Sequence, residues 1–151
     1  NILPTRAWAR INYRLLPGDR IDDVITRVKE ITDPAQIAVT IIGKPTEASP
    51  VSSTESAGFR TIENTIADVF PVTLTAPALF IAMSDTRHYA DLASDIYRFR
   101  PIHVGPDDVT RFHGVNERLS VENFQQMVTF YYRLMVNAAQ TDTSRTDNTA
   151  D

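Results

Sequence analysis

The sequence predicts an α/β protein, because segments with the two-residue period of a strand alternate with segments that have the spacing of an amphipathic helix. Residues 5–16 alternate apolar and polar side chains, residues 21–31 follow the helical spacing, and residues 37–42 alternate again. Such an order is typical of a sheet that carries helices on its faces. The 42% hydrophobic and 23% charged content is that of an ordinary folded chain.

The first three elements predict a β-α-β unit. In the first strand, Thr5–Leu16, one face is apolar and the other is largely cationic. The sequence "PGD" then turns the chain, Asp19 is suited to cap the following helix, and Pro34 ends that helix. The apolar surface of this unit is too small for independent folding, since about 40 residues is the lower limit without disulfides or metals. We therefore expect it to need a partner half.

A second structural unit follows a stretch without periodicity. Residues 43–56 are rich in Pro, Ser and Thr, which favours a boundary that separates residues 1–46 from residues 47–140. The second unit is predicted to contain a helix over Ser56–Phe70 and buried strands over two further segments, Val72–Met83 and Arg98–Val104.

The last predicted helix has the clearest pattern. Ser120 is placed to cap it, and Glu122 in its first turn favours the helix dipole. Its apolar stripe consists of Phe124, Met127, Val128, Tyr131, Leu134 and Met135. Residues 141–151 are polar and predict a disordered tail.

Charge and composition exclude several classes of protein. The net charge of −4 argues against a general binder of nucleic acid, which needs a basic surface. No apolar run reaches the roughly 20 residues of a membrane-spanning helix, and we expect no secretory leader at the beginning of the sequence. Because the chain has no cysteine, a metal would have to bind His, Asp and Glu side chains. The compartment stays open.

Polar side chains gather in the stretch "SDTRHY", residues 84–89, directly after the apolar run "PALFIAM". Open α/β sheets place ligand sites at the carboxyl ends of their strands. Arg87 can bind a carboxylate with its planar guanidinium, Asp85 can orient Arg87, and His88 can titrate near neutral pH. The alternative is an ordinary capped helix start with solvated side chains, which the residues alone favour.

The stretch "FHGVNERLS", residues 112–120, precedes the last helix. His113 is followed by Gly114, which permits an unusual backbone turn. A neutral imidazole fixed in a loop suits zinc, so His113 is a candidate metal ligand, with Glu117 as an acceptor for its other ring nitrogen. A hydrogen-bonded loop histidine is the simpler interpretation, and the spacing alone favours it.

These motifs carry a resemblance to a known family. The stretches "NILPTRAWARINYRLLPGD", "PVSSTES", "SDTRHY" and "FHGVNERLSVENF" resemble, in the same order, the aminoacylase and carboxypeptidase S family of di-zinc metallopeptidases. The first resembles the strand and turn of that family's lid, or dimerisation, domain, and the other three resemble the C-terminal half of its catalytic domain. The matches extend from residue 1 to about residue 139.

The resemblance implies roles for three residues. His113 matches a histidine that binds one of two zinc ions, Arg87 lies in a segment that resembles the substrate-carboxylate-binding Thr-Asp-x-Arg, and Asn1 matches a lid asparagine that reaches toward the substrate. The implied activity is hydrolysis of an amide bond next to a free carboxylate, in a peptide or an N-acyl amino acid. The segment departs from the family pattern, Gly-Gly-Thr, at Ala82, Met83 and Ser84.

The family's remaining active-site residues have no match in this sequence. They comprise a His-x-Asp motif, a bridging aspartate, a Glu-Glu pair with the general base, and a lid histidine. One histidine cannot hold a catalytic zinc, which needs about three protein ligands. The sequence thus resembles the C-terminal piece of a longer enzyme, and we expect it to hydrolyse nothing alone but to complete an active site with the N-terminal part.

The resemblance also implies a fold and partners. The first unit is expected to be half of a ferredoxin-like lid that supports a homodimer, and the second to be the C-terminal half of an α/β catalytic domain. Cobalt or manganese would also suit a site of histidine and carboxylates. Two other interpretations stay open: a non-catalytic dimerisation or assembly module, and a metal-free carboxylate-binding domain that uses Arg87, Asn1 and the cationic strand face.

Overall fold

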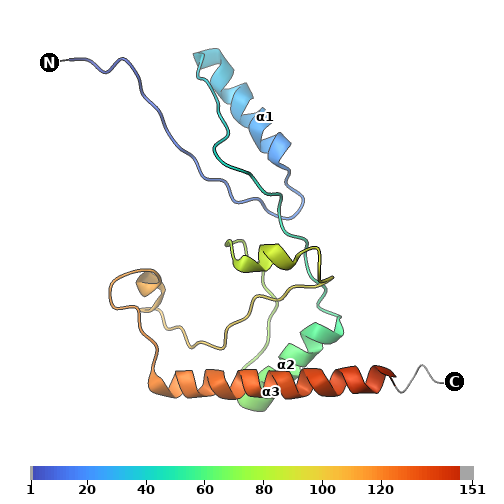
Figure 1. The fold of residues 1–151 in the computed structure, drawn as a ribbon. Helices are drawn as coiled ribbons and strands as arrows, with labels where there is room; N and C mark the ends of the chain where they lie inside the picture. Colours follow the sequence, from blue (N-terminus) through green and yellow to red (C-terminus); the bar gives the residue numbers. More distant parts are fainter. Residues whose placement is uncertain (1, 147–151) are drawn as a thin grey trace. The chain divides into compact units, whose positions relative to one another are not determined.

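The computed structural model describes residues 2–146, and within that range it contains helices but no β-strand (Figure 1). The predicted α/β fold, including the ferredoxin-like half lid, is therefore wrong. The α-helices are α1 (Ile21–Thr32), α2 (Ala57–Val69) and α3 (Val121–Thr146). Short 3-10 helices are η1 (Asp33–Ala35), η2 (Asp85–Tyr89) and η3 (Val109–Arg111). Asn1 and residues 147–151 lie outside the described residues.

The segments predicted as strands fail for one physical reason. Alternating side chains show which residues share a face, but a strand exists only when its backbone pairs with a neighbouring segment. No such pairing occurs within residues 2–146, where these segments run as irregular chain. The apolar face of the first of these segments, Thr5–Leu16, is exposed as a result, since Ile11 keeps 64% of its surface in solvent. The segments are Thr5–Leu16, Ile37–Ile42, Val72–Met83 and Arg98–Val104.

The chain divides into two compact units. The first comprises residues 1–51 and 79–88, and the second comprises residues 52–78 and 89–151. The division into a lid part and a catalytic part remains a prediction about a longer protein. Helix α3 continues to Thr146, past residue 141 where the tail was predicted to begin.

In the first unit, hydrogen bonds near the N-terminus of helix α1 fix the start of the helix. The sequence predicted Asp19 as the N-cap, but the N-cap position is Arg20, whose side chain makes no capping bond. The Asp19 carboxylate instead accepts a hydrogen bond from the backbone N–H of Leu16 at 3.0 Å, which closes the preceding turn. The Glu47 carboxylate accepts one from the N–H of Ile21 at 3.2 Å. No described residue of this unit is buried.

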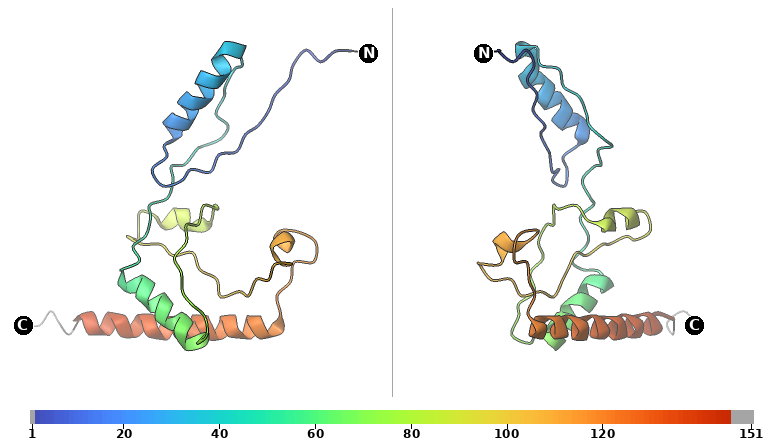
Figure 2. Two further views of the ribbon diagram at one scale, coloured as in Figure 1. Left: turned by 180° about the vertical axis from the view of Figure 1, so that it is seen from behind. Right: turned by 60° about the vertical axis from the view of Figure 1, so that its left-hand side comes forward.

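In the second unit, helix α2 packs against helix α3 (Figure 2). Ser56 caps α2, because its Oγ accepts a hydrogen bond from the backbone N–H of Phe59 at 3.1 Å. The hydroxyl of Tyr97 lies 2.5 Å from the same oxygen and ties the cap to a distant part of the unit. None of the described helices is both long and apolar enough to cross a membrane.

The core of the second unit surrounds Phe130 on α3. Phe130 is only 1% exposed, and Ile66 on α2 is 4% exposed. The ring of Phe130 lies 5.2 Å from that of Phe99 and 6.3 Å from that of Phe70, measured between centroids. Aromatic rings at these separations pack favourably, so this cluster joins the two helices to the segment between them.

Asn123 fastens an irregular segment to the start of α3. Ser120 caps the helix as predicted, and its Oγ accepts from the backbone N–H of Asn123 at 3.0 Å. The buried Asn123 side chain accepts from the N–H of His103 at 2.9 Å and donates to the carbonyl of Pro101 at 3.1 Å. These bonds satisfy backbone groups that a strand neighbour would otherwise pair.

Candidate active-site loop

The loop before α3 is built around Asp108. Its Oδ2 accepts a hydrogen bond from the backbone N–H of Gly105 at 2.9 Å, and its Oδ1 pairs with the guanidinium of Arg111 at 2.5 Å. The Gly105 N–H, followed by Arg111, holds the pKa of the Asp108 carboxyl below its ordinary value. Both partners stabilise the charged form, so the carboxylate fastens the loop that leads to His113.

His113 has a left-handed backbone, with φ of 59°. Such a conformation is uncommon for a residue with a side chain, and it is concentrated at functional sites. The carboxylate of Glu117 accepts a hydrogen bond from the His113 backbone N–H at 3.1 Å. The sequence predicted Glu117 beside the imidazole, but its carboxylate holds the main chain instead. The imidazole is exposed, and within residues 2–146 its nitrogens have no hydrogen-bond partner.

Gly114 lets the loop approach η3 closely. Its N–H donates to the carbonyl of Arg111 at 2.9 Å. A Cβ at this position would lie 3.2 Å from the carbonyl oxygen of Thr110 and 3.4 Å from that of Arg111. Because these neighbours are backbone atoms, no side-chain rotation relieves the crowding.

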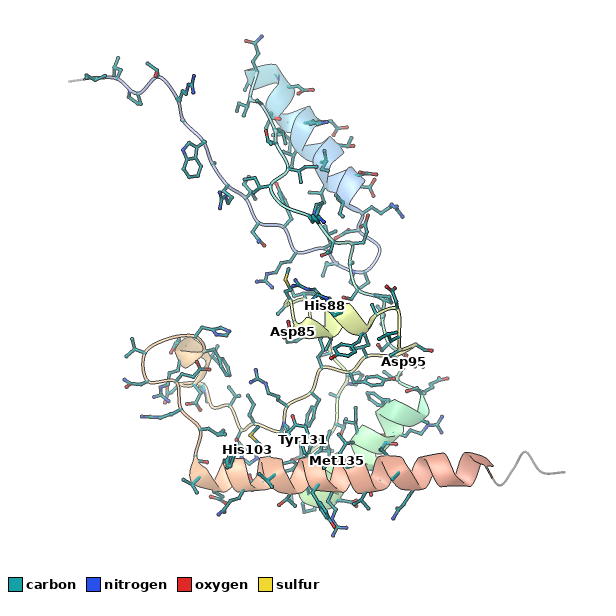
Figure 3. The ribbon with its side chains drawn as sticks, viewed as in Figure 1. Asp85, His88, Asp95, His103, Tyr131 and Met135 are labelled. Carbon is teal, nitrogen blue, oxygen red and sulfur yellow. The ribbon has the colours of Figure 1, made fainter. Side chains whose placement is uncertain are left out.

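The stretch "SDTRHY" forms the short helix η2, on which Asp85 and His88 both lie (Figure 3). Arg87 is exposed, and its Nε donates to Nε2 of His88 at 3.1 Å. Its Nη1 contacts the sulfur of Met83 at 2.6 Å. No hydrogen bond or ion pair joins Asp85 to Arg87 among the described residues, whereas His88 does accept a hydrogen bond from the guanidinium.

The candidate residues belong to different parts of the chain. Arg87, Asp85 and His88 lie in the first unit, whereas His113 and Glu117 lie in the second. Asn1 lies outside the described residues. The structure thus brings together Arg87 with His88, and His113 with Glu117.

The described residues do not form a complete zinc site. A catalytic zinc takes about three protein ligands. Within residues 2–146, no three His, Cys, Asp or Glu side chains come together in a group that could hold a metal ion. His113 with Glu117 provides at most part of such a set, so His113 fits zinc only as one ligand among others.

Sequence reasoning missed two residues that shape this region. Asp108 lies in the turn "GPDD", where an acidic residue is common. No local sequence signal shows that one of its carboxylate oxygens binds the Gly105 N–H and the other binds Arg111. Asn123 lies three residues after the cap Ser120, and the backbone groups that its side chain binds, on His103 and Pro101, are 20 and 22 residues away. Pairing at that distance leaves no periodic pattern in the sequence.

The curated proteins that are similar to this chain include a carboxypeptidase S-like protein and an N-fatty-acyl-amino acid synthase/hydrolase. "Probable carboxypeptidase S-like 2" of Dictyostelium discoideum is 40% identical over 137 residues, which is 91% of this chain and 26% of the relative. An N-fatty-acyl-amino acid synthase/hydrolase of Mus musculus is 37% identical over 141 residues, or 91% of this chain and 28% of the relative. The chain thus spans about a quarter of the length of these relatives. No family model and no solved structure matches it.

Proposed function

Because this chain is homologous to the carboxypeptidase S-like proteins and the N-fatty-acyl-amino acid synthase/hydrolases over 26–28% of their length, we propose that it supplies part of a hydrolase active site. The reaction is hydrolysis of an amide bond next to a free carboxylate, in a peptide or an N-acyl amino acid. The 40% identity to a probable carboxypeptidase carries the proposal. The isolated chain is then inactive. The longer protein forms a homodimer through its lid part.

Arg87 is the residue proposed to bind the substrate carboxylate. Its guanidinium is exposed, and among residues 2–146 its Nη2 has no partner. A planar guanidinium forms charge-assisted hydrogen bonds with a carboxylate. The bond from Nε to His88 restricts how the guanidinium turns, which supports a fixed direction for the bound carboxylate. Asp85 would act on this site only through longer-range charge, and Asn1 is proposed to reach the same substrate.

His113 is the residue proposed to bind zinc, as one ligand of a site that other parts of the longer protein complete. Zinc, expected as two ions in a complete active site, would polarise the amide carbonyl and activate water there. The exposed imidazole and the left-handed backbone support this role. Glu117 supports it by holding the backbone N–H of His113.

A full-length chimera tests the proposal, with this chain in place of the matched 137 residues of the Dictyostelium discoideum relative. We expect the chimera to release amino acid from N-acyl amino acids or dipeptides, and the isolated chain to release none. Loss of a residue that supports a metal ligand costs about 10–100-fold, so loss of the ligand in His113→Ala should lower the activity of the chimera by at least about a hundredfold.

Val115→Ala is the matched control, since Val115 lies in the same loop and is 85% exposed. It should leave the activity close to that of the unsubstituted chimera. Equal activity of the two variants would remove His113 from the site. An active isolated chain would show that the residues needed for hydrolysis are all present in it.

A further inference from the structure

Helix α3 has a second apolar face besides the one that contains Phe130. Its side chains follow one another at helical spacing and are between 40% and 66% exposed. We call this set the outer apolar face, and Figure 3 shows two of its members, Tyr131 and Met135, on the helix. The outer apolar face consists of Phe124, Val128, Tyr131 and Met135.

The outer apolar face is unusual for a helix that borders solvent. A surface helix has one apolar stripe, whereas a helix with apolar residues around most of its circumference is a buried one. The charged side chains of the first four turns, Glu122 and Arg133, do not belong to the outer face. Among residues 2–140, whose burial the structure describes, the buried apolar side chains are those of Phe130, Ile66 and Pro101, so this part of the chain buries little apolar surface by itself.

We propose that the outer apolar face of α3 docks against the remainder of the longer protein, the roughly three quarters of the relatives' length that this chain does not match. The inference rests on the proposed function, which requires that remainder. In the relatives the matched segment and the remainder form one chain, so their contact is intramolecular and is favoured by a high effective concentration. An uncharged face of aromatic and aliphatic side chains fits an apolar surface of that remainder.

Cysteine labelling of the chimera tests the docking surface. The chain has no cysteine of its own, so Val128→Cys and Thr129→Cys each introduce one thiol, on adjacent residues of which only Val128 belongs to the outer face. Both residues are exposed in the isolated chain, where we expect a maleimide to label both thiols at similar rates. In the chimera, labelling at position 128 should be at least about tenfold slower than at position 129. Mass spectrometry of the α3 peptide measures both rates.

Two labelling outcomes overturn the docking proposal. Equal labelling at the two positions in the chimera means that the outer face stays in solvent. Slow labelling of Val128→Cys in the isolated chain, with a dimer in sedimentation velocity, means that a second copy covers it. Labelling is independent of catalysis. A hydrolysing chimera with an accessible position 128 refutes only the docking surface, and an inactive chimera with a protected position 128 refutes only the proposed function.

Discussion

Helices α1 and α2 are nearly equal in length, with 12 and 13 residues, but differ in what holds them. Helix α2 has a side-chain cap and buries Thr65 and Ile66, whereas α1 has no side-chain cap and no buried residue. Both have an amphipathic sequence. The difference therefore lies in the partner: α2 has α3 to cover its apolar side, and α1 has only irregular chain of its own unit. An amphipathic pattern predicts a helix but does not supply the surface that stabilises it.

The largest expected effect is that of Phe130→Ala, which removes the centre of the aromatic cluster. Truncation of a buried phenylalanine costs about 3–5 kcal/mol. Hydrogen exchange of the α3 amides should accelerate accordingly, and that of the α1 amides should stay unchanged. Equal acceleration in both helices would show that α1 depends on the Phe130 cluster as α3 does.

A smaller effect is expected for Asn123→Ala. The substitution leaves the N–H of His103 and the carbonyl of Pro101 without their side-chain partner, at a cost of about 1–3 kcal/mol. Urea unfolding followed by circular dichroism measures it. Asn123→Asp keeps an acceptor for His103 but places a buried carboxylate oxygen against the carbonyl oxygen of Pro101, so we expect it to lose at least as much stability. If Asn123→Ala left the free energy of unfolding unchanged, solvent would have replaced both hydrogen bonds.

Ile31→Ala should change the free energy of unfolding by no more than about 0.5 kcal/mol, as is usual at surface positions. Ile31 is 62% exposed on α1. The same substitution at Ile66, 4% exposed on α2, should cost about 2–5 kcal/mol. Comparable losses in the two variants, measured by thermal unfolding, would reveal a core in the first unit.

The smallest effect concerns pH in the loop of the second unit. Because the folded-state pKa of Asp108 is lowered from 3.8, its carboxylate stabilises the loop above that pH, and the contribution is lost as the pH falls through the folded value. The amide resonance of Gly105 should therefore titrate with a midpoint below 3.8. In Asp108→Asn this titration should disappear, and its persistence would assign it to another group.

The sequence allowed prediction of features that depend on near neighbours. Apolar spacing predicted helices over residues 21–31 and 56–70, close to α1 and α2, and Ser120 was predicted as the cap of α3. The strands were wrong because pairing depends on a distant segment, and no local pattern reveals whether that segment is present.

The candidate site shows the same division. The sequence singled out the loop of His113, but it did not predict that Glu117 binds the main chain. That bond accompanies a left-handed backbone at His113, which directs the chain after it, and no local pattern in the sequence predicts this conformation. The contact of Met83 with Arg87 was likewise missed, since only the departure from the family's glycine pair was visible in the sequence.

The crowding around Gly114 bears on which sequence variants the protein tolerates. Alanine, the smallest replacement, already brings a Cβ to 3.2 Å from the Thr110 carbonyl oxygen, so every missense change at this codon must displace the main chain next to His113. Valine, which is branched at Cβ, adds further bulk at the same crowded point, so we expect it to destabilise the turn more than alanine does. Replacements at position 114 therefore act on the backbone beside His113 and leave its imidazole chemically unchanged.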